Sequence, residues 1–130
     1  VLCLADEAGA HDADRLAQLA AVLAVGSHAL MPSAAAPLCK LLPDEVRDRV
    51  SLVDDWAHPA VRFDAVLFHG SADKLRRLNQ ALAGRPGPVI LAEGHAPGDH
   101  AIALERLVHE RSLSINTAAA GGNATLMTIG

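Results

Sequence analysis

Aromatic side chains are scarce in this sequence of 130 residues, which holds two phenylalanines, one tryptophan and no tyrosine. The hydrophobic residues, 51% of the chain, are therefore mainly alanine, leucine and valine. Side chains of this size suit close packing of helices on a sheet. A domain of this length buries about two thirds of the surface of its unfolded chain, so one full hydrophobic core is expected.

An excess of positive charge and a long hydrophobic run are also lacking. Lysine and arginine number 11 against 15 aspartates and glutamates, and no basic stripe is present, which excludes nucleic acid as a partner of this chain. No apolar run approaches the ~20 residues of a membrane-spanning helix, and there is no secretory signal. We therefore expect a cytoplasmic protein without a membrane span.

Cysteine is limited to Cys3 and Cys39, which have no CxxC spacing. This usage predicts reduced, buried thiols in a cytosolic protein. The histidines show no HxxxH or HExxH pairing, so we expect no metal site. They lie at positions 11, 28, 58, 69, 95, 100 and 109. The chain lacks an initiating methionine and Val1 already lies in a strand-like run, so we expect a piece of a longer polypeptide.

Short apolar runs alternate with amphipathic stretches along the chain. The apolar runs predict strands at residues 1–5, 28–31, 50–53, 64–69 and 88–91. The amphipathic stretches predict helices at 11–25, 38–42, 72–83 and 101–111, with a helical turn at 44–49. Such alternation is typical of a parallel sheet with helices on both faces. The sequence predicts an α/β, Rossmann-like domain over residues 1–111, with a mostly parallel sheet of about five strands covered by helices.

Candidate capping residues lie at the ends of the predicted helices. Asp12 or Asp14 is a candidate N-cap of the first helix, and Gly26 is the glycine that ends it. Gly70 and Ser71 precede the helix predicted at 72–83. Two interpretations of this pair stay open. Either the free N–H groups at the helix start hold a phosphate, or Ser71 is an ordinary N-cap.

No glycine-rich dinucleotide fingerprint follows the first predicted strand. That turn reads ADEAGAHD, with one glycine and three acidic residues that would repel a pyrophosphate. The acidic pairs at 6–7 and 54–55 resemble the Mg²⁺ cluster of phosphoacceptor receiver domains. The lysine that such a domain needs at the end of its fifth strand is missing from PVILAEG (88–94), which argues against that class.

The last seventeen residues, 114–130, are unlike a solvated tail, because they carry no side chain that titrates near neutral pH and they end in apolar residues. Disordered tails are normally charged and poor in apolar side chains. We therefore predict that residues 112–130 form an extended flap that docks by main-chain pairing to a sheet edge, or in a groove of another domain or subunit. The predicted docking or lid residues are Asn116, Thr117, Gly121, Gly122, Asn123, Leu126, Met127 and Ile129.

Three stretches resemble the aldehyde dehydrogenase superfamily. AAVLAVGSHALMPSAAAP (20–37) is similar to that family's helix, turn and strand before a Lys-Pro-Ser/Ala-Glu motif. DAVLFHGSADKLRRL (64–78) resembles its Phe-Thr-Gly-Ser strand and helix, and PVILAEG falls where the family has Glu-Leu-Gly-Gly. In addition, ERLVHERSLSINTAAAGGNATLMTIG (105–130) resembles the C-terminus of long-form proline utilization A, a family of bifunctional bacterial enzymes of proline catabolism.

Positions that would contact a cofactor depart from the aldehyde dehydrogenase pattern. Met31 and Ala34 stand where a lysine and a glutamate would meet the ribose and adenosine. Leu75 replaces the glycine beside the pyrophosphate, and Leu91 or Ala92 stands where the general-base glutamate would be. The resemblance therefore implies a domain without catalytic residues and without cofactor or metal of its own.

The resemblance implies a non-catalytic C-terminal domain of an enzyme that converts proline to glutamate. The parent would use FAD in its proline dehydrogenase and NAD in its L-glutamate γ-semialdehyde dehydrogenase. Residues 112–130 would cover the semialdehyde site and help to channel the intermediate. The implied partner is the aldehyde dehydrogenase module of the same polypeptide or of a second subunit, and an isolated fragment would form a swapped homodimer or leave its tail disordered. The alternatives are a vestigial NAD-binding domain at Gly70 and Ser71, or an oligomerisation module. Peripheral attachment of the cytoplasmic parent to the inner membrane is left open.

Overall fold

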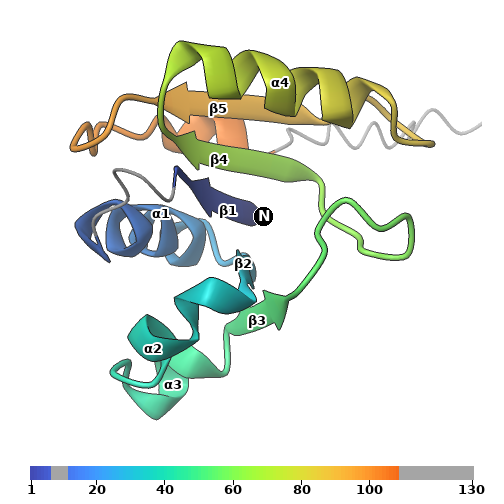
Figure 1. Ribbon diagram of the computed structural model, residues 1–130. Helices are drawn as coiled ribbons and strands as arrows, with labels where there is room; N and C mark the ends of the chain where they lie inside the picture. The colour runs from blue at the N-terminus through green and yellow to red at the C-terminus, as the bar shows by residue number, and fades with distance from the viewer. Residues whose placement is uncertain (7–11, 109–130) are drawn as a thin grey trace, which may run out of the picture.

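The molecule is built on a five-stranded parallel sheet with the strand order β3-β2-β1-β4-β5 (Figure 1). The structure, a computed structural model, describes residues 1–6 and 12–108. The strands are β1 (Leu2–Ala5), β2 (Ala29–Pro32), β3 (Val50–Val53), β4 (Ala65–His69) and β5 (Leu91–His95). The predicted α/β fold with a parallel sheet is confirmed, whereas the predicted flap at 112–130 lies outside the described residues.

Helices lie on both faces of this sheet. They are α1 (Asp12–Ala24), α2 (Ala36–Cys39), α3 (Asp44–Arg47) and α4 (Ala72–Ala83), with 3-10 turns η1 (Ser33–Ala35) and η2 (Leu104–Leu107). Figure 1 shows α1 on one face and α4 on the other. No described helix is long and apolar enough to cross a membrane.

Alternate residues of the central strands divide the core into two clusters. Cys3 and Leu67 pack with Val22 on the α1 side, whereas Leu4 and Phe68 pack on the α4 side. Because β1 and β4 are buried on both faces, their sequences are apolar rather than alternating, except for His69 at the end of β4. The apolar runs in the sequence therefore predict the buried positions of β1 and β4.

Both cysteine thiols are free and buried, as predicted. Burial raises the pKa of the Cys3 thiol to about 12, and it also raises the pKa of Cys39. A thiol with a raised pKa carries little thiolate, which is the reactive form. These cysteines therefore serve as small hydrophobic residues of the core.

The sequence predicts the C-terminal end of α1 correctly but not its N-terminal end. At the C-terminus Gly26 has a φ of 72°, and the N–H of Ser27 donates to Val22 O at 3.0 Å, which is the Schellman arrangement that Gly26 predicted. At the N-terminus the prediction of Asp14 as N-cap is wrong. Asp14 lies inside the first turn and is completely buried, and Asp12 is already the first helical residue.

Two predicted elements after α4 are displaced. The fifth strand comprises Leu91–His95 rather than 88–91, and Glu93 and His95 pair with Leu67 and His69 of β4. The helix expected at 101–111 is, within the described residues, only the turn η2. The backbone N–H groups of residues 101 and 103 donate to the carboxylates of Asp99 and Glu93.

The remaining helical elements differ less from prediction. The helix expected at 38–42 is observed as α2, two residues earlier, with Pro37 near its start, where proline is tolerated. The helical turn expected at 44–49 is α3. The crossover from β3 to β4 has no helix. Arg85 holds it by donating to the carbonyl oxygens of Trp56 at 3.0 Å and Val61 at 2.6 Å.

Candidate functional site

The carboxyl ends of β1 and β4 mark the point where the strand order of the sheet reverses. In open α/β sheets, ligands bind in the crevice at such a point. Gly70 and Ser71 lie here, because Gly70 follows β4 directly and Ser71 is the N-cap of α4. Their surroundings determine whether the chain has room for the pyrophosphate of a dinucleotide.

Side chains of the chain itself occupy the space beside Gly70 and the first turn of α4. Lys74 forms an ion pair with Asp6, and the Ser71 hydroxyl accepts the backbone N–H of Lys74 at 3.4 Å. A Cβ on Gly70 would lie 2.5 Å from Cζ of Phe68 and 3.0 Å from Cβ of Asp6, so this glycine is required by packing. The Asp6 carboxylate beside the start of α4 repels a second anion, so these residues do not fit a pyrophosphate.

Leu75 narrows the same region from the first turn of α4. Its side chain lies against Gly94 of β5 so closely that a Cβ on Gly94 would collide with Cδ2 of Leu75. Leu75 therefore packs α4 onto β5. Met31, at the position expected for a cofactor-binding lysine, is 1% exposed and belongs to the core on the α1 side. The absence of a cofactor in this segment stays a prediction.

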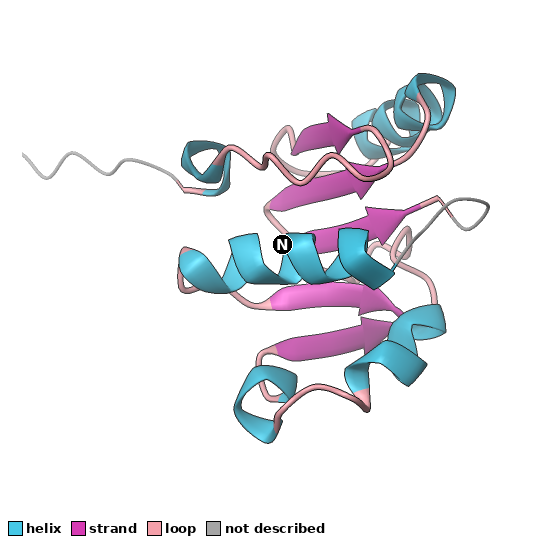
Figure 2. Cartoon of the chain, turned by 90° about the vertical axis from the view of Figure 1, so that its left-hand side faces the viewer, coloured by secondary structure: helices cyan, strands magenta, loops and turns pink. Residues whose placement is uncertain are grey.

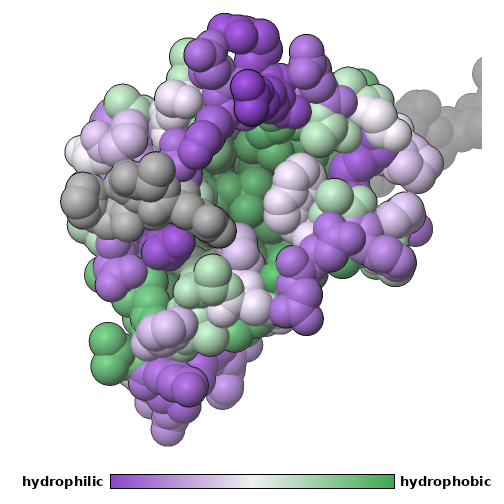
Figure 3. Space-filling model, in the orientation of Figure 1, coloured by the Kyte–Doolittle hydropathy of each residue, from purple (hydrophilic) through white to green (hydrophobic). Residues whose placement is uncertain are grey.

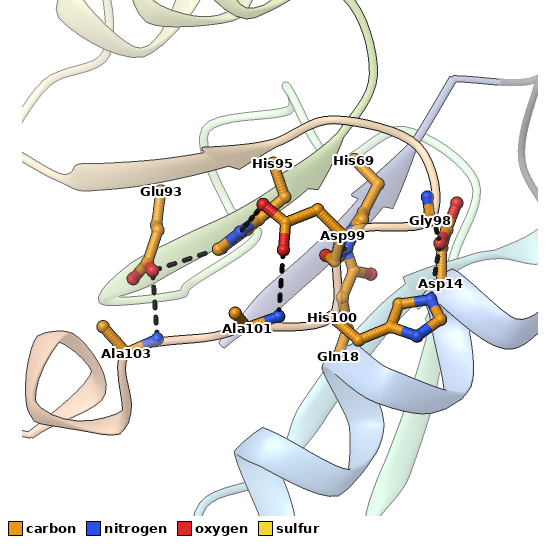
Figure 4. A network of polar contacts seen from close by, with 10 residues as sticks. All are labelled: Asp14, Gln18, His69, Glu93, His95, Gly98, Asp99, His100, Ala101 and Ala103. Atoms are coloured by element: carbon orange, nitrogen blue, oxygen red, sulfur yellow. Dashed lines mark hydrogen bonds and ion pairs between the residues drawn. The ribbon is translucent and has the colours of Figure 1, made fainter.

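A network of buried polar groups lies at the same carboxyl end of the sheet, on its α1 side (Figure 4). Asp14 is the best-buried carboxylate of this network. Its Oδ1 accepts the backbone N–H of Gly98 at 2.9 Å and lies 2.9 Å from Nε2 of His100. Burial alone would raise the pKa of Asp14. The hydrogen bonds from His100 and Gly98 outweigh burial, so the pKa lies below its usual value.

His69 ends β4 and uses both of its ring nitrogens. Nδ1 lies 2.9 Å from Nε2 of Gln18, and Nε2 lies 2.8 Å from the backbone oxygen of Asp99. The Gln18 amide also donates to Leu4 O at 2.8 Å, which fixes its nitrogen toward the sheet. His69 therefore accepts at Nδ1 and donates at Nε2, as the neutral tautomer does.

Glu93 and His95 extend the network along β5. Glu93 Oε1 accepts the backbone N–H of Ala103 at 3.2 Å and lies 3.1 Å from Nε2 of His95. The ring of His95 stacks on that of His69 with a centroid distance of 5.1 Å. In the described part of the chain, no three His, Cys, Asp or Glu side chains form a group that could hold a metal ion. The network is thus suited to holding backbone in place.

Sequence reasoning missed this network because its members are far apart in the chain. The sequence pattern places Asp14 as a candidate cap, leaves residue 93 between the predicted strand and helix, and shows no HxxxH or HExxH pairing of histidines. One signal was available: the apolar run of β4 ends in His69, and a polar ring at the end of a buried strand needs partners. The predicted docking residues, from Asn116 to Ile129, lie outside the described residues.

A hollow opens on the α4 side of the sheet and extends to the side chains of Asp6 and Lys74. Figure 3 shows it beneath α4 as a hydrophobic depression surrounded by hydrophilic residues. Its volume is about 530 Å³, and Leu4, Phe68, Leu78 and Trp56 are among its lining residues. The hollow is open because the crossover between β3 and β4 lacks a helix that would cover this face.

The charge of Asp14 leads to a prediction about pH. Because the folded-state pKa of Asp14 is depressed, its stabilising contribution is present above the unfolded value of about 3.9 and is lost as the pH falls through the folded-state pKa. Asp14→Asn should lower the free energy of unfolding at pH 7 by about 1 kcal/mol, the difference between charged and neutral hydrogen bonds. The deficit should vanish in strong acid.

Urea denaturation at a series of pH values measures this deficit. Asp44→Asn is the matched control, because the Asp44 side chain is 85% exposed and pairs with Arg47 on the same helix. A deficit for Asp14→Asn that stays constant from pH 7 into strong acid would contradict the assignment.

Comparison with known proteins adds a match over the whole chain, although no model of a protein family matches. The chain is 53% identical over its entire length to bifunctional protein PutA of Escherichia coli (strain K12) and 54% identical to that of Salmonella typhimurium. Over 87% of its length it is 43% identical to bifunctional protein PutA of Rhizobium meliloti. The chain spans about a tenth of the length of these relatives.

Proposed function

We propose, since the chain corresponds over its whole length to one segment of the bifunctional PutA proteins, that it is a non-catalytic domain of an enzyme that converts proline to glutamate. The proposed parent oxidises proline with FAD and oxidises glutamate γ-semialdehyde with NAD. In this proposal the segment is the parent's C-terminal domain and is related to the aldehyde dehydrogenase superfamily. Its site of action is the cytoplasm.

One observation carries the non-catalytic role. The crevice where a Rossmann-like domain would hold a dinucleotide contains the ion pair of Asp6 and Lys74 and the side chain of Leu75. These groups are held by contacts within the chain, so a nucleotide would have to displace them. In this proposal the fold serves as a structural support, and the functional surface lies elsewhere in the segment.

The proposed functional surface is the tail at residues 112–130. It docks on the aldehyde dehydrogenase module of the same polypeptide or of a second subunit, and covers the semialdehyde site. A lid made of alanine, glycine, threonine and asparagine adds no nucleophile beside an aldehyde, and its backbone excludes water from the intermediate. The segment thereby helps the intermediate to pass from the first active site to the second.

Removing residues 114–130 from the parent enzyme tests this function. Proline oxidation should be unchanged, whereas semialdehyde oxidation should fall, or the lag in coupled NADH production should lengthen, because the second site loses its cover. The measurement follows both half-reactions and the coupled reaction in one preparation of known oligomeric state. Normal values of all three at an unchanged subunit number would refute the lid.

A full-length variant tests whether docking of the tail, rather than the length of the chain, is what matters. Replacing Leu126, Met127 and Ile129 together by serine should reproduce the truncation, because burial of their side chains is what holds the tail. The matched control, Thr125→Ser with Thr128→Ser, alters the same stretch by removing only two methyl groups and should behave as the wild type. Measurable NAD binding to this segment by calorimetry would instead favour a vestigial nucleotide site.

A further inference from the structure

The hollow on the α4 side of the sheet lies at the carboxyl ends of β1, β2 and β3. Asp6, Pro32 and Asp54 stand at these strand ends, and all three line the hollow. The opposite wall is α4, which Figure 2 shows at the end of the sheet made by β4 and β5, away from β3. The hollow has a volume of about 530 Å³, within the range of ligand pockets, and open α/β sheets bind ligands at this end.

Apolar side chains from three sources form the floor of the hollow. Leu4 and Phe68 come from the neighbouring strands β1 and β4, Leu78 comes from α4, and Trp56 comes from the crossover between β3 and β4. The ring of Trp56 meets that of Phe63 edge to face, with the centroids 6.5 Å apart, so packing fixes its position. An apolar group of a ligand would be removed from water against these side chains.

The α4 wall of the hollow carries two positive charges. Lys74 and Arg77 are three residues apart in the helix, so they lie on one face of it, and both line the hollow. Lys74 pairs with Asp6. Within the part of the chain that the structure describes, Arg77 forms no ion pair, so its guanidinium is available to an anionic group.

The strand side of the hollow carries two negative charges, on Asp6 and Asp54. The Ser33 hydroxyl donates to Oδ1 of Asp54 at 2.5 Å, which orients this carboxylate without neutralising it. The charges of the lining therefore balance, with one positive group, Arg77, and one negative group, Asp54, not paired with an opposite charge. A ligand with a net charge gains little from such a lining, whereas a ligand that carries both charges is attracted by both groups.

We propose that this hollow binds a small zwitterion with an apolar body, of which an α-amino acid with a large apolar side chain is the simplest kind. The ligand carboxylate pairs with Arg77, whose planar guanidinium suits a carboxylate. The ligand ammonium pairs with Asp54, and the apolar side chain lies against Trp56 and Phe68. The ion pair of Asp6 and Lys74 stays intact, so this ligand, unlike a nucleotide, displaces nothing. The site goes beyond the proposed role of the segment as a support.

Titration of the 130-residue chain with L-phenylalanine, followed by ¹H–¹⁵N NMR, tests the proposal. Trp56 is the only tryptophan, so its indole N–H gives a single signal from within the hollow. This signal should shift saturably. 3-Phenylpropanoate, which lacks the ammonium, and phenethylamine, which lacks the carboxylate, should each bind about five- to tenfold more weakly, because each loses one charge-assisted hydrogen bond.

Two variants assign the charged ends of the ligand. Arg77→Gln should weaken binding of L-phenylalanine by the same factor and leave phenethylamine binding unchanged. Its control is Arg76→Gln, because Arg76 is the next residue of α4, is 67% exposed and pairs with Asp73 outside the hollow. Asp54→Asn should weaken binding of L-phenylalanine and leave 3-phenylpropanoate binding unchanged, with Asp55→Asn as its control.

Three results would overturn the proposal. The first is a Trp56 signal that does not shift saturably with L-phenylalanine up to its solubility limit. The second is equal affinity for the three compounds, which would mean apolar contact without recognition of charge. The third is an equal effect of Arg77→Gln and Arg76→Gln on L-phenylalanine binding. All these surface variants keep the core intact, and the dispersion of the same NMR spectra verifies that each is folded.

Discussion

Leu67→Ala is expected to lower the free energy of unfolding by about 2–5 kcal/mol, the range for deleting a buried leucine side chain. Leu67 has no exposed surface and lies in β4, between β1 and β5, within the core on the α1 side. Neighbouring strands cannot move inward without breaking their hydrogen bonds, so the cavity cannot collapse. Urea denaturation followed by circular dichroism measures the loss.

Leu52→Ala is the matched control for this prediction. Leu52 lies in the edge strand β3 and is 44% exposed, so the same chemical change removes fewer contacts. We expect a loss of less than about 1 kcal/mol. Equal losses at the two positions would mean that β4 is not an interior strand of the sheet.

His69→Ala is expected to cost a similar amount, about 2–5 kcal/mol, for two reasons. The ring is 1% exposed, so its removal leaves a cavity at the end of β4. The change also leaves the Gln18 amide and the Asp99 carbonyl without the partners they have at 2.9 and 2.8 Å. Because the Asp99 carbonyl belongs to residues 96–108, called the strap here, this segment should loosen as well.

The exposed His28 provides the control for His69→Ala, since it undergoes the same chemical change on the surface. We expect His28→Ala to change stability by no more than about 0.5 kcal/mol. Stability is measured by urea denaturation, and loosening of the strap by proteolysis within residues 96–108. A His69→Ala variant as stable as His28→Ala would show that the buried network contributes nothing.

The losses expected for Leu67→Ala and His69→Ala separate two contributions of the α1 side of the sheet, packing and hydrogen bonding. Leu67 contributes packing alone, whereas His69 contributes packing and a hydrogen bond to a segment that follows β5 by only a few residues. Loss of Leu67 should therefore destabilise the domain as a whole. Loss of His69 should in addition expose the strap to protease under conditions where the sheet remains folded.

Local sequence determined the elements whose signals are contained within a few residues. The apolar runs of β1 and β4 specify buried central strands, because no exposed strand would lack polar residues on both faces. Gly26 ends α1 because only glycine adopts a φ of 72° at low cost. Ser71 caps α4 through its own hydroxyl. In each case the cause and the element are neighbours in the chain.

Tertiary structure decided the elements whose hydrogen-bond partners are distant in sequence. Residues 92–95 contain a charge, a glycine and a histidine, and they form a strand because β4 supplies the backbone pairing. Within the described residues, the amphipathic stretch at 101–108 contains only the turn η2, and the N–H of Ala103 donates to the distant Glu93 carboxylate. Apolar periodicity measures which face is buried, whereas the choice of backbone partner depends on groups that only folding brings together.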